Sequence, residues 1–246
     1  MGADRAEMAQ DGTFPVIEHR RIYQEGASMA LKKGEQAFQN YFCHAPTLRQ
    51  TICRGYWDLT VHILTPMVVA HIEKPENLRI LEIGYGGGRI LNATCGFFGH
   101  VYGLDIHNES TEVERFLKEM GRDNFTLIQG DGNNIPLPDE SLDLVYSFIT
   151  FIHLAGIDQF RDYVVESYRV LKPGGIIHFY YGKIDDGYRE RRTNANESSL
   201  TMSEPVTEII LRQARFKIID RGQSFKTAPD GFPLKKGWQG YLTGLR

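Results

Sequence analysis

The stretch Ile80-Leu81-Glu82-Ile83-Gly84-Tyr85-Gly86-Gly87-Gly88-Arg89-Ile90 decides the fold of this chain. Residues 79–83 are apolar-rich and favour extended structure, so they predict a short buried strand. The glycines that follow allow a tight turn in which the backbone approaches a ligand without Cβ clashes. Residues 89–95 are compatible with a helix whose free N–H groups face that turn. This order predicts a ligand site at the end of the strand.

The residues around the turn indicate which ligand it binds. Glu82 directly precedes the first glycine, and an ionised carboxylate only accepts hydrogen bonds. The expected ligand therefore offers donors, such as ribose hydroxyls or an ammonium group. A dinucleotide turn needs G-x-G-x-x-G, but Arg89 stands where the third glycine would fall. A nicotinamide-dependent dehydrogenase is thus the weaker interpretation, and a glycine turn without a ligand is the structural alternative.

Strands and helices are predicted to alternate from residue 78 onward. The strands are short and apolar, and residues 158–171 form an amphipathic helix with Phe160 and Val164 on one face. Short connections between such elements imply a parallel sheet with helices on both faces. Strands are predicted at 79–83, 101–106, 125–129, 142–148, 176–181, 216–220 and 237–245, the last one antiparallel. The predicted fold class is α/β, with a doubly wound, mostly parallel seven-stranded sheet.

The N-terminal region is predicted to be helical. Residues 20–43 and 47–72 are helix-compatible, and apolar positions in the second stretch recur every three or four residues. Gly55 and Pro66 are the points at which that stretch could kink or split. The expected organisation is one compact unit with a helical cap at 1–77, a domain at 78–246 and a lid-like insertion at 182–204.

Composition excludes several classes of partner. The 246 residues carry a formal net charge of −3 with a pI near 6.2, which argues against a nucleic-acid surface. No apolar run is long enough to cross a bilayer, so no membrane partner is expected. The odd number of cysteines, Cys43, Cys53 and Cys95, without a C-x-x-C pair predicts reduced thiols in a cytoplasmic protein. No metal site is expected, because the histidines also lack metal-binding spacing.

Polar residues stand where the predicted parallel strands end. Asp105 ends the second strand, Asp131 follows the third in a Gly-Asp-Gly turn, and Ser147 ends the fourth. Open parallel sheets bind ligands at the carboxyl ends of their strands. A carboxylate at such a place can accept hydrogen bonds from a ribose diol. The structural alternatives are that Asp105 caps the next helix and that Asp131 only forms its turn.

Five segments together resemble a known family. They are 82–88, Asp105, 130–132, the D-x-V-x-S run at 143–147 and Arg169-Val170-Leu171-Lys172-Pro173-Gly174-Gly175. This combination resembles the class I S-adenosylmethionine (SAM) methyltransferases, in the small-molecule branch called type 11, over residues 78–246. The resemblance implies a Rossmann-like methyltransferase fold with SAM as cofactor and S-adenosylhomocysteine as its product. The cofactor-binding residues that it implies are Glu82, Gly84, Tyr85, Gly86, Gly88, Asp105, Ile106, Asp131, Gly132, Asn133 and Ser147.

The resemblance also implies a reaction. A methyl group would pass by in-line displacement to an oxygen or nitrogen of a small-molecule metabolite. His153 follows the fourth strand where this branch often carries a histidine, and it is the candidate general base. The alternative for His153 is a packing or hydrogen-bonding role, and the alternative for the chain is a SAM-binding scaffold or sensor without transfer activity. A homodimer is compatible with the sequence.

Overall fold

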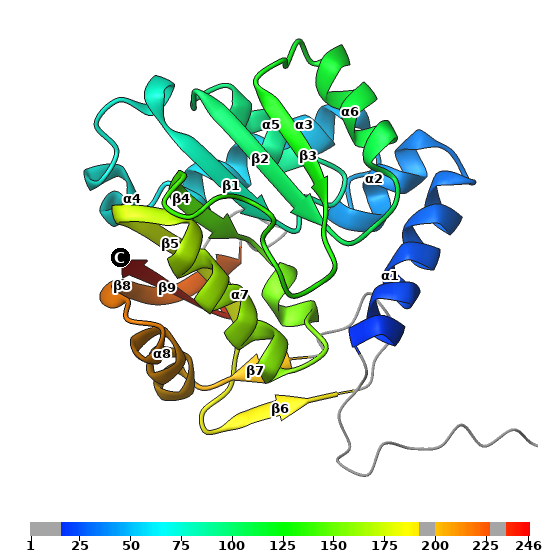
Figure 1. The fold of residues 1–246 in the computed structure, drawn as a ribbon. Coiled ribbons are helices and arrows are strands. Elements are labelled where there is room, and N and C mark those ends of the chain that lie inside the picture. Colours follow the sequence, from blue (N-terminus) through cyan, green and yellow to red (C-terminus); the bar gives the residue numbers. More distant parts are fainter. Residues whose placement is uncertain (1–15, 192–199, 227–234) are drawn as a thin grey trace, which may run out of the picture.

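A nine-stranded sheet runs through the centre of the part described by the computed structural model, which comprises residues 16–191, 200–226 and 235–246 (Figure 1). Five neighbouring strands pair in parallel in the order β3-β2-β1-β4-β5. Their bounds are β1 Arg79–Ile83, β2 His100–Asp105, β3 Phe125–Gln129, β4 Leu142–Ser147 and β5 Leu171–Lys183. All five carboxyl ends consequently point toward one side of the molecule.

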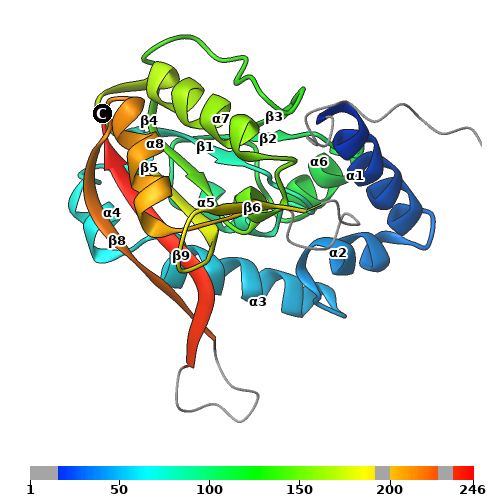
Figure 2. The same ribbon diagram turned by 90° about the horizontal axis from the view of Figure 1, so that it is seen from below.

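Helices cover both faces of the sheet, as predicted for a doubly wound fold. Figure 2 shows α7 and α8 on one side of the sheet and α3 and α5 on the other. Successive strand residues point to opposite faces, so Ile80 joins one hydrophobic core and Leu81 the other. The helices outside the N-terminal region are α5 Arg89–Cys95, α6 Ser110–Glu119, α7 Ile157–Val170 and α8 Glu204–Gln213. None of the described helices is long and apolar enough to cross a membrane.

The strand count of seven was too low. The two additional strands, β6 Tyr188–Glu190 and β7 Leu200–Met202, lie within the segment predicted as a lid-like insertion. Each is three residues long, too short to show a clear alternation in the sequence. Their pairing depends on β5, which extends further than expected and contacts β7 through Gly182. Residues 192–199 of the predicted insertion lie outside the described part.

The final strand is antiparallel, which confirms the prediction. β9 Lys235–Leu245 pairs with β5 on one side and with β8 Lys217–Lys226 on the other. Both pairings are antiparallel, so β8 runs in the same direction as β5. The hairpin thus extends the sheet beyond β5 by two long strands.

The N-terminal helices follow the predicted stretches but divide them. These elements are α1 Val16–Leu31, α2 Glu35–Cys43, α3 Leu48–Asp58, the π-helical turn Leu59–Ile63, α4 Pro66–Ala70 and the 3-10 turn Pro75–Asn77. Gly34, with φ of 111°, separates α1 from α2. Pro66 starts α4, with Thr65 as its side-chain cap. Gly55 causes no break; a Cβ there would lie 2.1 Å from the Arg89 carbonyl oxygen, so it lets α3 cross α5 closely.

Two of these helices dock on the loops that follow the parallel strands. The Gln24 Nε2 atom on α1 donates to the Ile106 carbonyl at 2.8 Å, after β2. The Gln39 Nε2 atom on α2 donates to the Gly87 carbonyl at 2.8 Å, after β1. The helices therefore lie over the carboxyl ends of the strands, which the sequence marked as the ligand side.

Candidate functional site

Steric constraints explain the glycines at positions 84 and 86 in the turn after β1. Gly84 and Gly86 have φ of 82° and 51°, in the left-handed region. A Cβ at Gly84 would lie 2.0 Å from the Thr150 Oγ1 atom, and one at Gly86 would lie 2.8 Å from the Phe42 ring. The turn thus packs between the loop after β4 and the cap helix α2.

Asp105 fastens the end of β2 to this turn. Its Oδ2 atom accepts a hydrogen bond from the Gly86 N–H at 2.7 Å, and its Oδ1 atom accepts from the Ile106 N–H at 2.7 Å. The side chain is 11% exposed. Because each carboxylate oxygen can accept more than one hydrogen bond, a held carboxylate retains capacity for a ligand.

His107 is a component of the site that the sequence did not predict. It is buried, and its Nδ1 atom accepts from the Glu109 N–H at 3.0 Å. The proton therefore lies on Nε2, which donates to the Gly86 carbonyl at 3.0 Å. This imidazole ties the loop after β2 to the glycine turn. The only signal in the sequence was its place two residues after Asp105.

A cavity of about 170 Å³ lies between the strand ends and the cap. The cap helices, the glycine turn, the end of β2, the loop after β4 and helix α7 all contribute to its wall. The cavity brings together five of the residues predicted to form the site: Gly84, Gly86, Asp105, Ile106 and His153.

Other predicted residues lie outside the cavity lining and bond the strands and loops that form it. Glu82 is buried and accepts a hydrogen bond from the Tyr146 hydroxyl at 2.9 Å, and burial raises its pKa to about 8. The Ser147 hydroxyl donates to the Ile83 carbonyl at 2.9 Å and so joins β4 to β1. Tyr85 is buried, with its ring packed edge-on against an imidazole. The predicted residues outside the cavity lining are Glu82, Tyr85, Gly88, Asp131, Gly132, Asn133 and Ser147.

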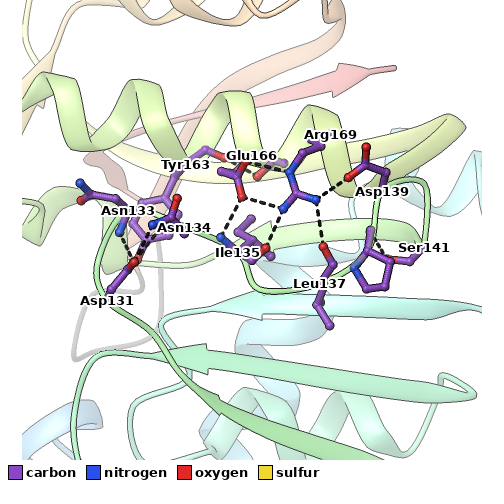
Figure 3. Close-up of polar contacts among 12 residues, drawn as sticks. Asp131, Asn133, Asn134, Ile135, Leu137, Asp139, Ser141, Tyr163, Glu166 and Arg169 are labelled. Atoms are coloured by element: carbon purple, nitrogen blue, oxygen red, sulfur yellow. Dashed lines mark hydrogen bonds and ion pairs between the residues drawn. The ribbon is translucent and has the colours of Figure 1, made fainter.

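The Asp131 side chain bonds the backbone of its own turn, which is the alternative to a ligand contact (Figure 3). Its Oδ1 atom accepts from the backbone N–H groups of Asn133 and Asn134, at 2.9 and 2.8 Å. These bonds outweigh partial burial and lower the pKa of the carboxyl. Gly132 is held from the other side, because its carbonyl accepts from the Gln159 Nε2 atom at 2.6 Å. The turn is rigid, and Gln159, which the sequence did not single out, connects it to the cavity wall.

Arg169 holds the rest of the same loop against α7 (Figure 3). Its guanidinium donates to the carbonyls of Ile135 and Leu137 at 2.7 and 2.9 Å. It also pairs with Glu166 at 2.7 Å and with Asp139 at 2.6 Å. The arginine of the R-V-L-K-P-G-G element thus organises the loop between β3 and β4.

His153 lines the cavity from the loop that follows β4. It ends the 3-10 turn Thr150–His153, which follows Ile149 in a left-handed conformation with φ of 71°. The ring of Tyr23 from α1 lies edge-on to the His153 ring, 5.9 Å between centroids. His19, also from α1, has its pKa lowered to about 4 by burial and then by the neighbouring His153 charge. The cap therefore contacts the candidate base.

A buried ion pair joins the cap to the same wall. Arg89, at the start of α5, donates from Nε to the Asp58 carboxylate of α3 at 3.0 Å. Its Nη2 atom lies 2.9 Å from the same oxygen. Arg54 approaches that oxygen to 3.8 Å and also lines the cavity. Arg89, which stands where a dinucleotide motif needs its third glycine, thus anchors the cap.

Together, the parallel sheet, the glycine turn after β1 and the carboxylate that ends β2 define a nucleotide-binding α/β fold of the class I methyltransferase type. Residues 81–179 match the family model described as a methyltransferase domain, type 11. This match agrees with the resemblance to the class I SAM-dependent methyltransferases of the type 11 branch that the five segments indicated.

Curated relatives resemble this central region. Sterol 24-C-methyltransferase ERG6B of Gibberella zeae is 32% identical over 114 residues, which are 45% of this chain and 29% of that protein. Demethylmenaquinone methyltransferase of Geobacillus sp. is 41% identical over 86 residues, 35% of this chain and 36% of that protein. The chain spans about a third of the length of these relatives.

Solved structures share the fold over a larger part of the chain. The 1,6-didemethyltoxoflavin-N1-methyltransferase of Burkholderia thailandensis aligns with 98% of this chain and 92% of its own, at 15% identity and a TM-score of 0.64. A SAM-dependent methyltransferase of Methanosarcina mazei aligns with 74% of this chain and 98% of its own, at 17% identity and a TM-score of 0.59. The first similarity includes the N-terminal helices.

Proposed function

We propose that the chain transfers a methyl group from SAM to an oxygen or nitrogen of a small-molecule metabolite, which leaves S-adenosylhomocysteine. The observation that supports this most is that one cavity is lined by Gly84, Gly86 and Asp105 and also by His153. A donor held at the glycine turn and an acceptor beside His153 would share that space.

This arrangement suits methyl transfer from a sulfonium. The leaving group is already activated, so alignment of the two reactants and exclusion of water supply most of the catalysis. The region 1–77, of which residues 1–15 lie outside the described part, is proposed to act as the cap, because α1 and α2 cover the strand ends. His153 would accept the proton released by a hydroxyl or amine, an effect of about 10²–10⁴-fold.

The names of similar proteins support a small-molecule acceptor. They include a sterol methyltransferase, a demethylmenaquinone methyltransferase and a toxoflavin-precursor methyltransferase whose structure holds both its substrate and S-adenosylhomocysteine. The alternative is a SAM-binding protein without transfer activity. The fold alone does not decide between the two, because the [4+2]-cyclase SpnF shares it at a TM-score of 0.52 and 16% identity.

The test combines binding with turnover. The wild-type chain is incubated with methyl-labelled SAM and fractions of a small-molecule metabolite extract, and labelled products are identified by mass spectrometry. We expect a labelled small molecule, and we expect His153→Ala to lower the turnover rate about 100-fold with S-adenosylhomocysteine affinity nearly unchanged. His100→Ala is the control, since that imidazole bonds Thr126 outside the cavity.

Two results would change the proposal in different ways. Tight binding of S-adenosylhomocysteine without any labelled product would favour the scaffold or sensor. Normal turnover by His153→Ala would leave the methyltransferase in place and remove the general base from its mechanism.

A further inference from the structure

Two tyrosine hydroxyls in the cavity wall have no hydrogen-bond partner within residues 16–191, 200–226 and 235–246. They are the Oη atoms of Tyr23 and Tyr41, and both are buried. Both residues line the cavity. An unsatisfied buried hydroxyl costs about 1–3 kcal/mol, so each such group calls for a physical explanation.

Both hydroxyls belong to helices of the cap, and side-chain hydrogen bonds hold these helices against the strand ends. Tyr23 lies on α1, one residue before the Gln24 side chain that bonds the Ile106 carbonyl. Tyr41 lies on α2, two residues after the Gln39 side chain that bonds the Gly87 carbonyl. These bonds secure the two tyrosine-bearing helices to the loops after β2 and β1. The hydroxyls are therefore held in place without being used by the protein itself.

Helix α1 also leaves room for one of these groups. Gly26 faces α2, and a Cβ at this position would lie 2.3 Å from the Tyr41 Oη atom. Only glycine allows the hydroxyl to occupy its present place. The packing between α1 and α2 thus leaves space for the Tyr41 hydroxyl where a larger residue at position 26 would fill it.

The charge that both hydroxyls experience is that of Asp105. Burial raises the pKa of Tyr41, and the Asp105 carboxylate adds to the shift. Burial likewise raises the pKa of Tyr23, with further contributions from Tyr41 and then Asp105. Both phenols consequently stay protonated, and each can donate and accept one hydrogen bond or more. They are neutral polar groups that line the same cavity as the carboxylate that ends β2.

We propose that Tyr23 and Tyr41 are ligand-binding residues whose hydroxyls hydrogen-bond the ribose of the donor beside Asp105. A vicinal diol presents two donors and several acceptors, which matches one carboxylate and two phenols. The cap then completes the donor site as well as covering it. This inference rests on the proposed function, because it takes SAM as the donor.

The test removes each hydroxyl and keeps the ring. Tyr23→Phe and Tyr41→Phe are compared with Tyr181→Phe, since the Tyr181 Oη atom is also buried without a described partner but lies outside the cavity lining. The dissociation constants of S-adenosylhomocysteine and of adenosine are measured by calorimetry, with competition for the weaker ligand. We expect each cavity variant to weaken both ligands by the same factor, about five- to tenfold, the effect of one neutral hydrogen bond. The control stays within about twofold of the wild type.

A second readout separates binding from folding. Removal of an unpaired hydroxyl should leave the melting temperature of the unliganded variants unchanged or higher, so weaker binding cannot be attributed to damage of the fold. Unchanged dissociation constants in both cavity variants, or a loss for S-adenosylhomocysteine but not for adenosine, would overturn the ribose assignment. A wild-type chain that binds no S-adenosylhomocysteine would instead overturn the proposed function itself.

Discussion

At the scale of single residues, Asp105 has the most constrained position in the site. Its two oxygens accept from backbone N–H groups of the glycine turn and of its own loop, and the carboxylate still lines the cavity. This double role makes it both a link between β1 and β2 and a candidate ligand contact. The ribose interpretation of Asp105 remains a prediction that binding measurements can decide.

Asp105→Ala is expected to weaken S-adenosylhomocysteine binding by about 1.5–3 kcal/mol, the range for hydrogen bonds to a charged group. Calorimetry measures the change directly. Asp158→Ala is the matched control, because that carboxylate is 80% exposed and pairs with Arg161 one turn away on α7. Equal affinity of Asp105→Ala and the wild type would mean that the carboxylate serves the fold alone.

At the scale of elements, the loop between β3 and β4 depends on helix α7. Arg169 bonds two carbonyls of this loop, and Glu166 accepts from the Ile135 N–H at 3.0 Å. The pair Arg169 and Glu166 therefore determines where the Asp131 turn lies relative to the cavity.

Arg169→Ala is expected to lower the free energy of unfolding by about 2–3 kcal/mol, because it leaves backbone carbonyls and two carboxylates without their donor. Hydrogen exchange in residues 130–141 should rise, while exchange in β1 and β2 should not. Arg161→Ala on the same helix removes an exposed pair and should cost at most about 1 kcal/mol. A uniform rise in exchange, or equal stability of the two variants, would contradict this role.

At the scale of the whole molecule, buried ionisable groups in the sheet and in the cap helix α1 link stability to pH. Burial lowers the pKa of His19 and of His178 to about 4, and it raises the pKa of Glu82 to about 8. His178 donates from Nε2 to the His62 carbonyl at 2.8 Å within the core. The two histidines favour folding when neutral, and Glu82 favours folding when protonated.

These shifts predict a maximum of stability near pH 6.5. Between about pH 4.5 and 6.5 the unfolded chain binds two more histidine protons but one fewer glutamate proton, so acidification costs about 1.4 kcal/mol per pH unit. Between about pH 6.5 and 8 the histidines are neutral in both states, and only Glu82 differs between them. The folded chain then binds one more proton than the unfolded chain, so stability falls by about 1.4 kcal/mol per pH unit as pH rises. Urea unfolding at pH 5, 6.5 and 8 measures both slopes.

Glu82→Gln isolates the alkaline side of this profile. The amide cannot ionise, but its oxygen can still accept the bond from Tyr146. We expect the variant to lose the decline between pH 6.5 and 8 and to keep, or steepen, the decline toward acid. The same alkaline slope in the variant and the wild type would show that Glu82 ionises normally in the folded chain.

The sequence by itself determined the order of the five parallel strands, the glycine turn and the resemblance of the central domain to a methyltransferase family. These features are local: a strand's apolar run, a glycine's freedom at φ above zero and a motif's spacing are all properties of neighbouring residues. For the same reason Gly84, Gly86 and Asp105 were placed correctly at the ends of β1 and β2.

Only the tertiary structure decided which side chains face the cavity. Asp131 turns toward its own loop and Ser147 toward Ile83, because nearby backbone groups satisfy them first. β6 and β7 pair with each other, and β7 pairs with the extended end of β5. A three-residue strand is too short for its own sequence to predict such a pairing. Tyr23 reaches the cavity through the docking of α1, whose bond between Gln24 and Ile106 joins residues 82 positions apart. Contacts at that separation depend on the assembled fold, since no local pattern encodes them.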